Sequence, residues 1–154
     1  MPHSKDITSL LQGLNDDDKK LIEKAYVFAE KAHEGQKRNS GEPYFNHVFE
    51  TAKILAEFGM DAKTIVAGFL HDVLEDTPTP ETELEKEFGK EIVTLVNGVT
   101  KLGKMKYTGA ERHVESLRKF FMAMANDLRI LIIKLADRLH NIRTLQYVKP
   151  EKQK

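Results

Sequence analysis

Apolar residues recur at helical spacing along most of this 154-residue chain. One such stretch lies between residues 21 and 32, where the apolar positions are Leu21, Ala25, Phe28, Ala29 and Ala32. Separations of three or four residues place these side chains on one face of a helix. Asn15, followed by three aspartates, has the chemistry of a helix cap, and Gly35 that of a stop. The pattern therefore predicts a long amphipathic helix.

The same reasoning predicts helices over most of the remaining chain, with no convincing strand alternation. The expected helices cover residues 6–13, 44–58, 61–76, 80–88, 92–99, 110–125 and 127–147. Turn-forming residues predict an ordered loop over 36–43, and a basic, glycine-punctuated loop is expected over 101–110. No repeat or linker divides the chain. We expect an all-α fold, a compact bundle of about seven to eight helices forming a single domain over residues 1–154.

Composition narrows the class of protein. Cysteine is absent, which excludes disulfides, thiolate chemistry and cysteine-based zinc sites. No apolar stretch approaches the roughly 18 residues of a membrane span, and the N-terminus does not resemble a signal peptide. The formal net charge is zero, so nothing global favours nucleic acid or an anionic membrane as a partner. A cytoplasmic protein is expected, and its oligomeric state is left open.

The zero net charge hides an asymmetry. Residues 1–97 carry 11 basic against 19 acidic side chains, whereas residues 98–149 carry 11 against 4. An acidic half that can hold a divalent cation, beside a basic half that can hold phosphate, suits a metal-dependent phosphohydrolase. Oppositely charged, solvated helix faces are an equally good explanation at this point. The basic residues considered for phosphate are Lys101, Lys104, Lys106, Arg112, Arg118 and Lys119.

A polar cluster follows an apolar helix at residues 71–76. His71, Asp72, Glu75 and Asp76 come directly after the apolar run 65–70. Carboxylates are costly where a core helix emerges unless something is bound there, and a metal ion is the obvious candidate. Further ligands would have to come from elsewhere in the chain.

Two other residues could complete such a site. His47 lies on a predicted helix among apolar residues, and Asp137 lies in a strongly apolar part of the last helix. Each has a plain alternative, since His47 could be a satisfied core histidine and Asp137 could pair with Arg138 or another basic side chain. Lys134, Asp137, Asn141 and Thr144 are spaced 3, 4 and 3 apart, which stacks them on one helix face.

The order of these motifs resembles the HD superfamily of metal-dependent phosphohydrolases. More closely, it resembles the hydrolase domain of RelA/SpoT proteins, in four segments that together span about residues 20–148. These segments are residues 38–44 with His47, residues 69–77, residues 99–102 and residues 133–145. The resemblance implies an HD-domain helical bundle.

The family resemblance also implies an activity. This is removal of the 3′-pyrophosphate of (p)ppGpp, giving GDP or GTP and pyrophosphate, with manganese as the usual metal. The resemblance assigns metal binding to His47, His71, Asp72 and Asp137, and catalysis to Glu75 and Asp76. It assigns the nucleotide pocket to Arg38, Ser40, Asn141 and Thr144, to which we add Lys134 and Arg143.

The other histidines are expected to lie outside this site. His140 is expected to be structural, because it is one helical position from Asn141 and points elsewhere, and His33 and His113 are expected to be exposed. Val48 stands where the family usually has a proline, a change that removes no ligand.

Several alternatives remain open at the level of sequence. The chain is either an N-terminal fragment of a longer protein or a short stand-alone hydrolase. The site could act on another nucleotide, such as a 3′- or 2′-phosphate, or belong to an inactive regulatory module. The sequence alone does not say which of Glu75 and Asp76 is the acid and which the base.

Overall fold

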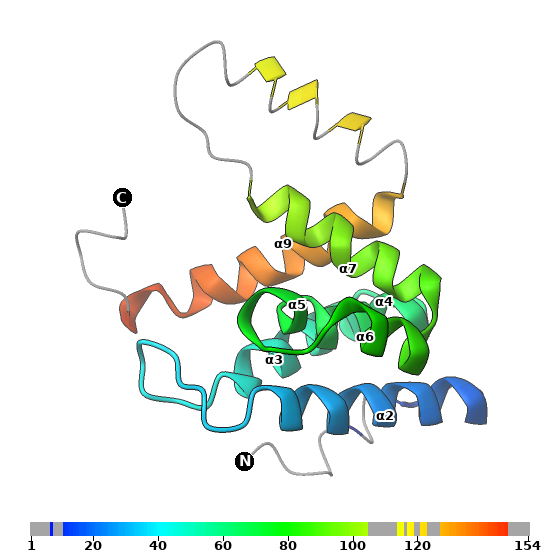
Figure 1. Cartoon of the computed structure of the whole chain (residues 1–154). Helices are drawn as coiled ribbons and strands as arrows, with labels where there is room; N and C mark the ends of the chain where they lie inside the picture. Colours follow the sequence, from blue (N-terminus) through cyan, green and yellow to red (C-terminus); the bar gives the residue numbers. More distant parts are fainter. Residues whose placement is uncertain are drawn as a thin grey trace.

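The computed structural model describes residue 7 and residues 11–104, 114–115, 117–118, 121–122 and 127–147. Its helices are α2 (Asp16–Ala32), α3 (Phe45–Glu57), α4 (Ala62–Leu70), α5 (Val73–Asp76), α6 (Glu81–Phe88), α7 (Lys90–Gly103) and α9 (Leu128–Arg143). A 3-10 turn follows at Leu145–Tyr147. The expected all-α bundle is thus seen, within these residues, as six helices of eight residues or more and the one-turn helix α5 (Figure 1).

Helix α4 forms the centre of the bundle. It packs against α2, α3, α7 and α9, and eight of its nine residues are buried. At Gly68 a β-carbon would lie 2.5 Å from Cδ1 of Leu55 and 3.4 Å from the Cα of Ala52. Glycine therefore permits the close approach of α3 and α4, which brings the start of α3 beside the end of α4.

The predicted capping chemistry holds in part. The Asn15 side chain accepts a hydrogen bond from the backbone N–H of Asp18 at 2.8 Å, which confirms the cap of α2. Asp61 precedes α4 as expected, but its carboxylate accepts from the hydroxyl of Thr64 and makes no hydrogen bond to the helix backbone. Helix α6 begins at Glu81, one residue later than predicted, because Pro80 is extended.

The main departure from the expected elements is at His71 and Asp72. The sequence predicts one continuous helix over 61–76, whereas α4 ends at Leu70 and α5 begins at Val73. Both intervening residues keep right-handed backbone angles, with ψ of −32° and −4°. The chain therefore continues with a local break that sets the imidazole and the carboxylate at a helix junction.

Helix α7 extends to Gly103, into residues expected to form a loop, while residues 105–110 of that loop lie outside the described part. Half of the helix expected over 6–13 and most of that expected over 110–125 also lie outside it, and residues 11–13 form a turn rather than a helix. The last helix is shorter than expected and ends at Arg143. Among the described residues, no helix has both the length and the apolar character needed to cross a membrane.

Candidate metal centre

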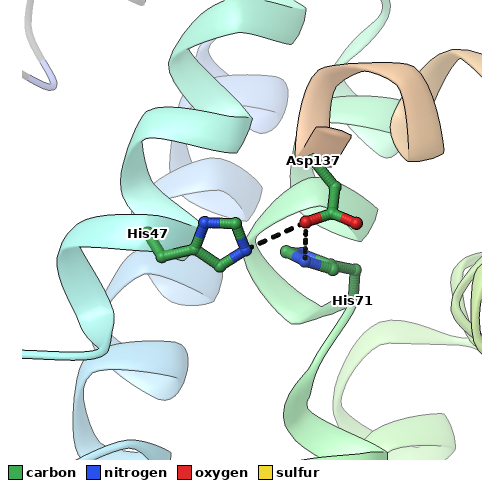
Figure 2. A group of neighbouring side chains, drawn as sticks. All are labelled: His47, His71 and Asp137. Atoms are coloured by element: carbon green, nitrogen blue, oxygen red, sulfur yellow. Dashed lines mark ion pairs between the residues drawn. The ribbon is translucent and has the colours of Figure 1, made fainter. Parts of the chain in front are cut away.

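Three side chains from three helices meet at one point beneath the surface. His47 comes from the first turn of α3, His71 from the end of α4 and Asp137 from the middle of α9 (Figure 2). One ligand atom from each lies within 4.8 Å of the other two. Nε2 of His47 is 3.1 Å and Nε2 of His71 is 3.8 Å from Oδ1 of Asp137. All three residues are buried.

Asp72 adds a second carboxylate to this group. Its Oδ2 lies 3.0 Å from Nε2 of His71 and 3.6 Å from Nε2 of His47. His71 and Asp72 occupy the break between α4 and α5, and these two consecutive side chains face the same point. The four residues that the sequence predicts as a set are therefore together in space.

The donor atoms fit a divalent cation. Nδ1 of His71 lies 2.7 Å from the carbonyl oxygen of Gly68 and can only donate to it, which fixes the tautomer and leaves Nε2 as the ligand atom. That Nε2 is buried and faces the carboxylates of Asp72 and Asp137. Two imidazole nitrogens and two carboxylates form a ligand set typical of divalent transition metals.

The negative charges of the buried carboxylates also favour a bound cation. Burial alone would lower the pKa of His71, but Asp72 and Asp137 raise it to about 10. Burial would likewise raise the pKa of Asp72, but the charge of His71 lowers it to about 2. In the metal-free protein a proton on His71 thus balances the carboxylates. A metal ion would displace that proton.

Asp137 is held by its own helix. Burial would raise its pKa, but the neighbouring imidazoles of His47 and His71 lower it. Nζ of Lys134 donates to its Oδ2 at 2.8 Å, and Nδ2 of Asn141 donates to its Oδ1 at 2.9 Å. The prediction that these side chains share one face of α9 is therefore confirmed at these three positions. Thr144 lies just past the helix and donates to the backbone carbonyls of His140 and Asn141.

The loop between α2 and α3 carries Arg38 to the carboxyl end of α9 (Figure 1). The loop is ordered by backbone hydrogen bonds from Arg38 N to Glu42 O and from Gly41 N to Arg38 O, both 2.9 Å. Gly41 has φ of +84°, a region that favours glycine. Nη2 of Arg38 donates to Oδ1 of Asn141 at 2.7 Å, so two residues predicted to line the nucleotide pocket are in direct contact.

Other predicted pocket residues lie at the edge of this arrangement. The hydroxyl of Ser40 accepts from Glu42 N within its own loop, and Arg143 is exposed near the end of α9. Lys101 and Lys104 belong to the end of α7, and Arg118 is exposed. Lys106, Arg112 and Lys119 lie outside the described residues, as does His113.

Two expectations about histidines are wrong. His140 does not point away from the site, because its Nδ1 lies 2.7 Å from Nδ1 of His47. It is three residues after Asp137, a helical spacing that could have revealed this position. His33 is buried rather than exposed, and its ring stacks on Tyr44 with centroids 4.9 Å apart. For His140, burial is the main cause that lowers the pKa to about 4, and the charges of His47 and Arg38 lower it further. The His140 ring is therefore neutral at pH 7.

Tyr44 is a site residue that the sequence reasoning gave no role. Its hydroxyl lies 2.8 Å from Oδ2 of Asp72 and 2.9 Å from Oδ2 of Asp76. Gln36 donates to the backbone oxygen of Asp76 at 2.6 Å. The side chain and the backbone of Asp76 are thus both tied to the α2–α3 loop.

Glu75 has a different environment from Asp76. Its side chain is exposed and borders a surface hollow of about 420 Å³, also lined by Thr100 and Lys104. Partial burial and the charge of Asp72 raise its pKa. A carboxylate with a raised pKa beside a possible metal site is suited to proton transfer.

Comparison with known proteins gives one family. A family model for the HD domain matches residues 25–154. The chain is 48% identical over 142 residues to the bifunctional (p)ppGpp synthase/hydrolase SpoT of Escherichia coli, covering 92% of this chain and 20% of that protein. It is 50% identical over 135 residues to a guanosine-3′,5′-bis(diphosphate) 3′-pyrophosphohydrolase of Spiroplasma citri, covering 87% of this chain and 18% of that protein.

Other similar proteins include a GTP pyrophosphokinase of Streptomyces coelicolor, 47% identical over 99% of this chain and 19% of that protein. The chain thus spans about a fifth of the length of these curated relatives. A solved structure of a metazoan ortholog of SpoT, described as hydrolysing ppGpp, matches with a TM-score of 0.69 and 28% identity. The match covers 86% of this chain and 77% of that structure.

Proposed function

Because this chain belongs to the HD-domain family, with relatives that include SpoT, we propose that it is a manganese-dependent (p)ppGpp 3′-pyrophosphohydrolase. The reaction would take ppGpp or pppGpp and water to GDP or GTP and pyrophosphate, in the cytoplasm. The observation that carries the proposal is the convergence of His47, His71 and Asp137 from three helices, with the buried Nε2 of His71 facing two carboxylates.

In this proposal His47, His71, Asp72 and Asp137 hold one divalent ion. The ion would supply Lewis acidity, polarising a phosphate oxygen and making a water more acidic. Lys134 and Asn141 keep the Asp137 carboxylate in place through hydrogen bonds of 2.8 and 2.9 Å. Such outer partners hold ligands in a productive orientation.

Glu75 is proposed to take part in proton transfer during hydrolysis. Hydrolysis forms a bond between the water oxygen and the phosphorus attached to the 3′ oxygen, and breaks the bond from that phosphorus to the 3′ oxygen. The water loses a proton and the 3′ oxygen gains one. The Glu75 carboxylate is exposed, and its raised pKa suits it to this exchange.

Asp76 is proposed to share the catalytic work from a fixed position. Its carboxylate accepts from Tyr44, and its backbone oxygen accepts from Gln36. A carboxylate restrained in this way is suited to orienting a water, because it loses little freedom when the water binds.

The nucleotide is proposed to bind beside Arg38. A guanidinium can contact phosphate oxygens in pairs, and Lys134 offers a point charge nearby on α9. Asn141, which contacts Arg38, would complete this side of the pocket. Ser40, Arg143 and Thr144 are proposed as outer members, on the basis of the family resemblance.

The test is to incubate the pure protein with Mn²⁺ and ppGpp and to follow pyrophosphate and GDP together. Equimolar release of both is expected. Release from other nucleotide phosphates, with ppGpp left intact, would favour a different substrate. Bound Mn²⁺ and bound ppGpp without turnover would identify a regulatory module instead.

A further inference from the structure

Nδ1 of His140 lies between two groups that belong to the site. It is 3.3 Å from Nη1 of Arg38 and 2.7 Å from Nδ1 of His47. The two imidazole rings lie with centroids 4.9 Å apart and an interplanar angle of 35°. His140 therefore joins the loop arginine to an imidazole of the metal centre.

The protons on these three groups can be assigned from their chemistry. Arginine is always protonated and has no acceptor, so Arg38 can only donate to His140. Nδ1 of His140 must then be an acceptor and carry no proton. Nδ1 of His47, at 2.7 Å from the same atom, must be a donor. The ring of His47 then presents the lone pair of Nε2 to the centre when it is neutral.

With this proton assignment, Nε2 of His47 is placed to bind a cation. Its Nε2 lies 3.1 Å from Oδ1 of Asp137 and 3.6 Å from Oδ2 of Asp72. A lone pair facing two carboxylates is unfavourable unless a positive ion lies between them. A bond from the opposite ring nitrogen to a fixed acceptor is the usual way in which proteins orient a histidine ligand.

We propose that His140 is a positioning residue for the metal centre, whose Nδ1 accepts a hydrogen bond from the Nδ1–H of His47 and so fixes Nε2 of His47 as a metal-binding atom. The inference rests on the proposed function only in taking the cluster to bind a divalent ion. Metal affinity is measured without substrate, so the proposal can fail while hydrolysis is found, and can hold while hydrolysis is absent.

The same contact gives Arg38 a structural role besides its proposed role in binding the nucleotide. Its Nη1 points to His140 and its Nη2 donates to Asn141, which in turn donates to Asp137. Each of the two terminal nitrogens of the guanidinium therefore contacts a residue that in turn contacts a proposed metal ligand. His140 acts in this arrangement as the acceptor shared by Arg38 and His47.

The test compares two substitutions at this position. His140→Leu removes the acceptor and puts an apolar side chain of similar length in its place. His140→Asn instead places an acceptor oxygen close to the position of Nδ1. Mn²⁺ affinity is measured from the electron paramagnetic resonance signal of the free ion. The loss of a partner of this kind typically weakens metal affinity by roughly 10- to 100-fold. We expect that loss for the leucine variant and recovery of most of the affinity for the asparagine variant. Arg138→Gln, at an exposed position on the same helix, is the matched control.

Wild-type affinity in the leucine variant would overturn the proposal. Equal losses in the leucine and asparagine variants would also overturn it, since the loss would then reflect packing. Should the leucine variant fail to fold, nitrogen-15 chemical shifts of the imidazoles in the wild-type protein loaded with diamagnetic Zn²⁺ decide the question. A proton on Nδ1 of His47 and none on Nδ1 of His140 is expected, and the reverse pattern refutes the assignment.

Discussion

The hydroxyl oxygen of Tyr44 lies 2.9 Å from Oδ2 of Asp76, which is 32 residues away in the sequence. The same hydroxyl is 2.8 Å from Oδ2 of Asp72. One phenolic group thus bridges a carboxylate proposed to bind metal and a carboxylate proposed to act in catalysis. Burial, and then the two aspartates, raise the pKa of Tyr44, so the phenol keeps its proton and remains a donor.

Tyr44→Phe should reduce turnover more than it reduces stability. A hydrogen bond to a charged group contributes about 1.5–3 kcal/mol, so kcat should fall by roughly 10- to 100-fold if Asp76 loses its orientation. The KM for ppGpp should change little, because the Tyr44 hydroxyl that is removed bonds to Asp72 and Asp76, which are not among the proposed nucleotide-binding residues. Steady-state kinetics at saturating Mn²⁺ measure both constants.

Thermal unfolding provides the control for this variant. The ring of Tyr44 stacks on His33, a contact that a phenylalanine ring can also make. A loss of turnover without a comparable loss of melting temperature supports the orienting role. Unchanged kcat in a folded variant would show that the bridge has no part in turnover.

Asp72→Asn and Glu75→Gln should have different effects on metal binding. The Asp72 carboxylate lies within 3.6 Å of both histidine nitrogens of the cluster, so its loss should abolish Mn²⁺ binding and with it activity. Glu75 is exposed at the next helical turn, and its loss should leave Mn²⁺ bound and remove turnover. Calorimetric titration with Mn²⁺ and pyrophosphate release measure the two properties. Equal loss of metal in both variants would contradict this division of roles.

The four predicted ligands could be identified from sequence because they lie in three recognisable motifs, one of which supplies both His71 and Asp72. His140 and Tyr44 show why other contacts were missed. The contact from His140 to His47 spans 93 residues, and that from Tyr44 to Asp76 spans 32. Helical periodicity specifies which residues share a face of one helix, but not which other element that face will contact. The apolar periodicity of 65–70 likewise gives no sign of the break between α4 and α5 at His71 and Asp72.

Gly98→Ala should destabilise the protein at the contact between α7 and α9. A β-carbon there would lie 2.3 Å from Cδ1 and 2.9 Å from Cγ1 of Ile130. Alanine favours a helix by about 1 kcal/mol over glycine, but overpacking a core costs about 1–3 kcal/mol, so a net loss is expected. Isoleucine is stiff at χ1, which limits relaxation. Urea denaturation measures the change in the free energy of unfolding.

A double variant tests the cause of that loss. Ile130→Ala removes the Cδ1, Cγ1 and Cγ2 atoms that a β-carbon at residue 98 would meet. Adding Gly98→Ala to this background should then be neutral or stabilising, because only the helix preference of alanine remains. An equal loss in both backgrounds would place the strain elsewhere than at Ile130.

Mn²⁺ should raise the melting temperature of the wild-type protein and not that of Asp137→Asn. A ligand that binds only the folded state at 100 times its dissociation constant stabilises that state by about 2.7 kcal/mol. Asp137 is the carboxylate on α9 that meets His47 from α3 and His71 from the end of α4, so an ion held there would join three helices. Differential scanning calorimetry with and without Mn²⁺ gives the shift for each protein. Lys20→Gln, on α2 and remote from the cluster, should retain the full shift, whereas an equal shift in Asp137→Asn would mean that the ion binds elsewhere.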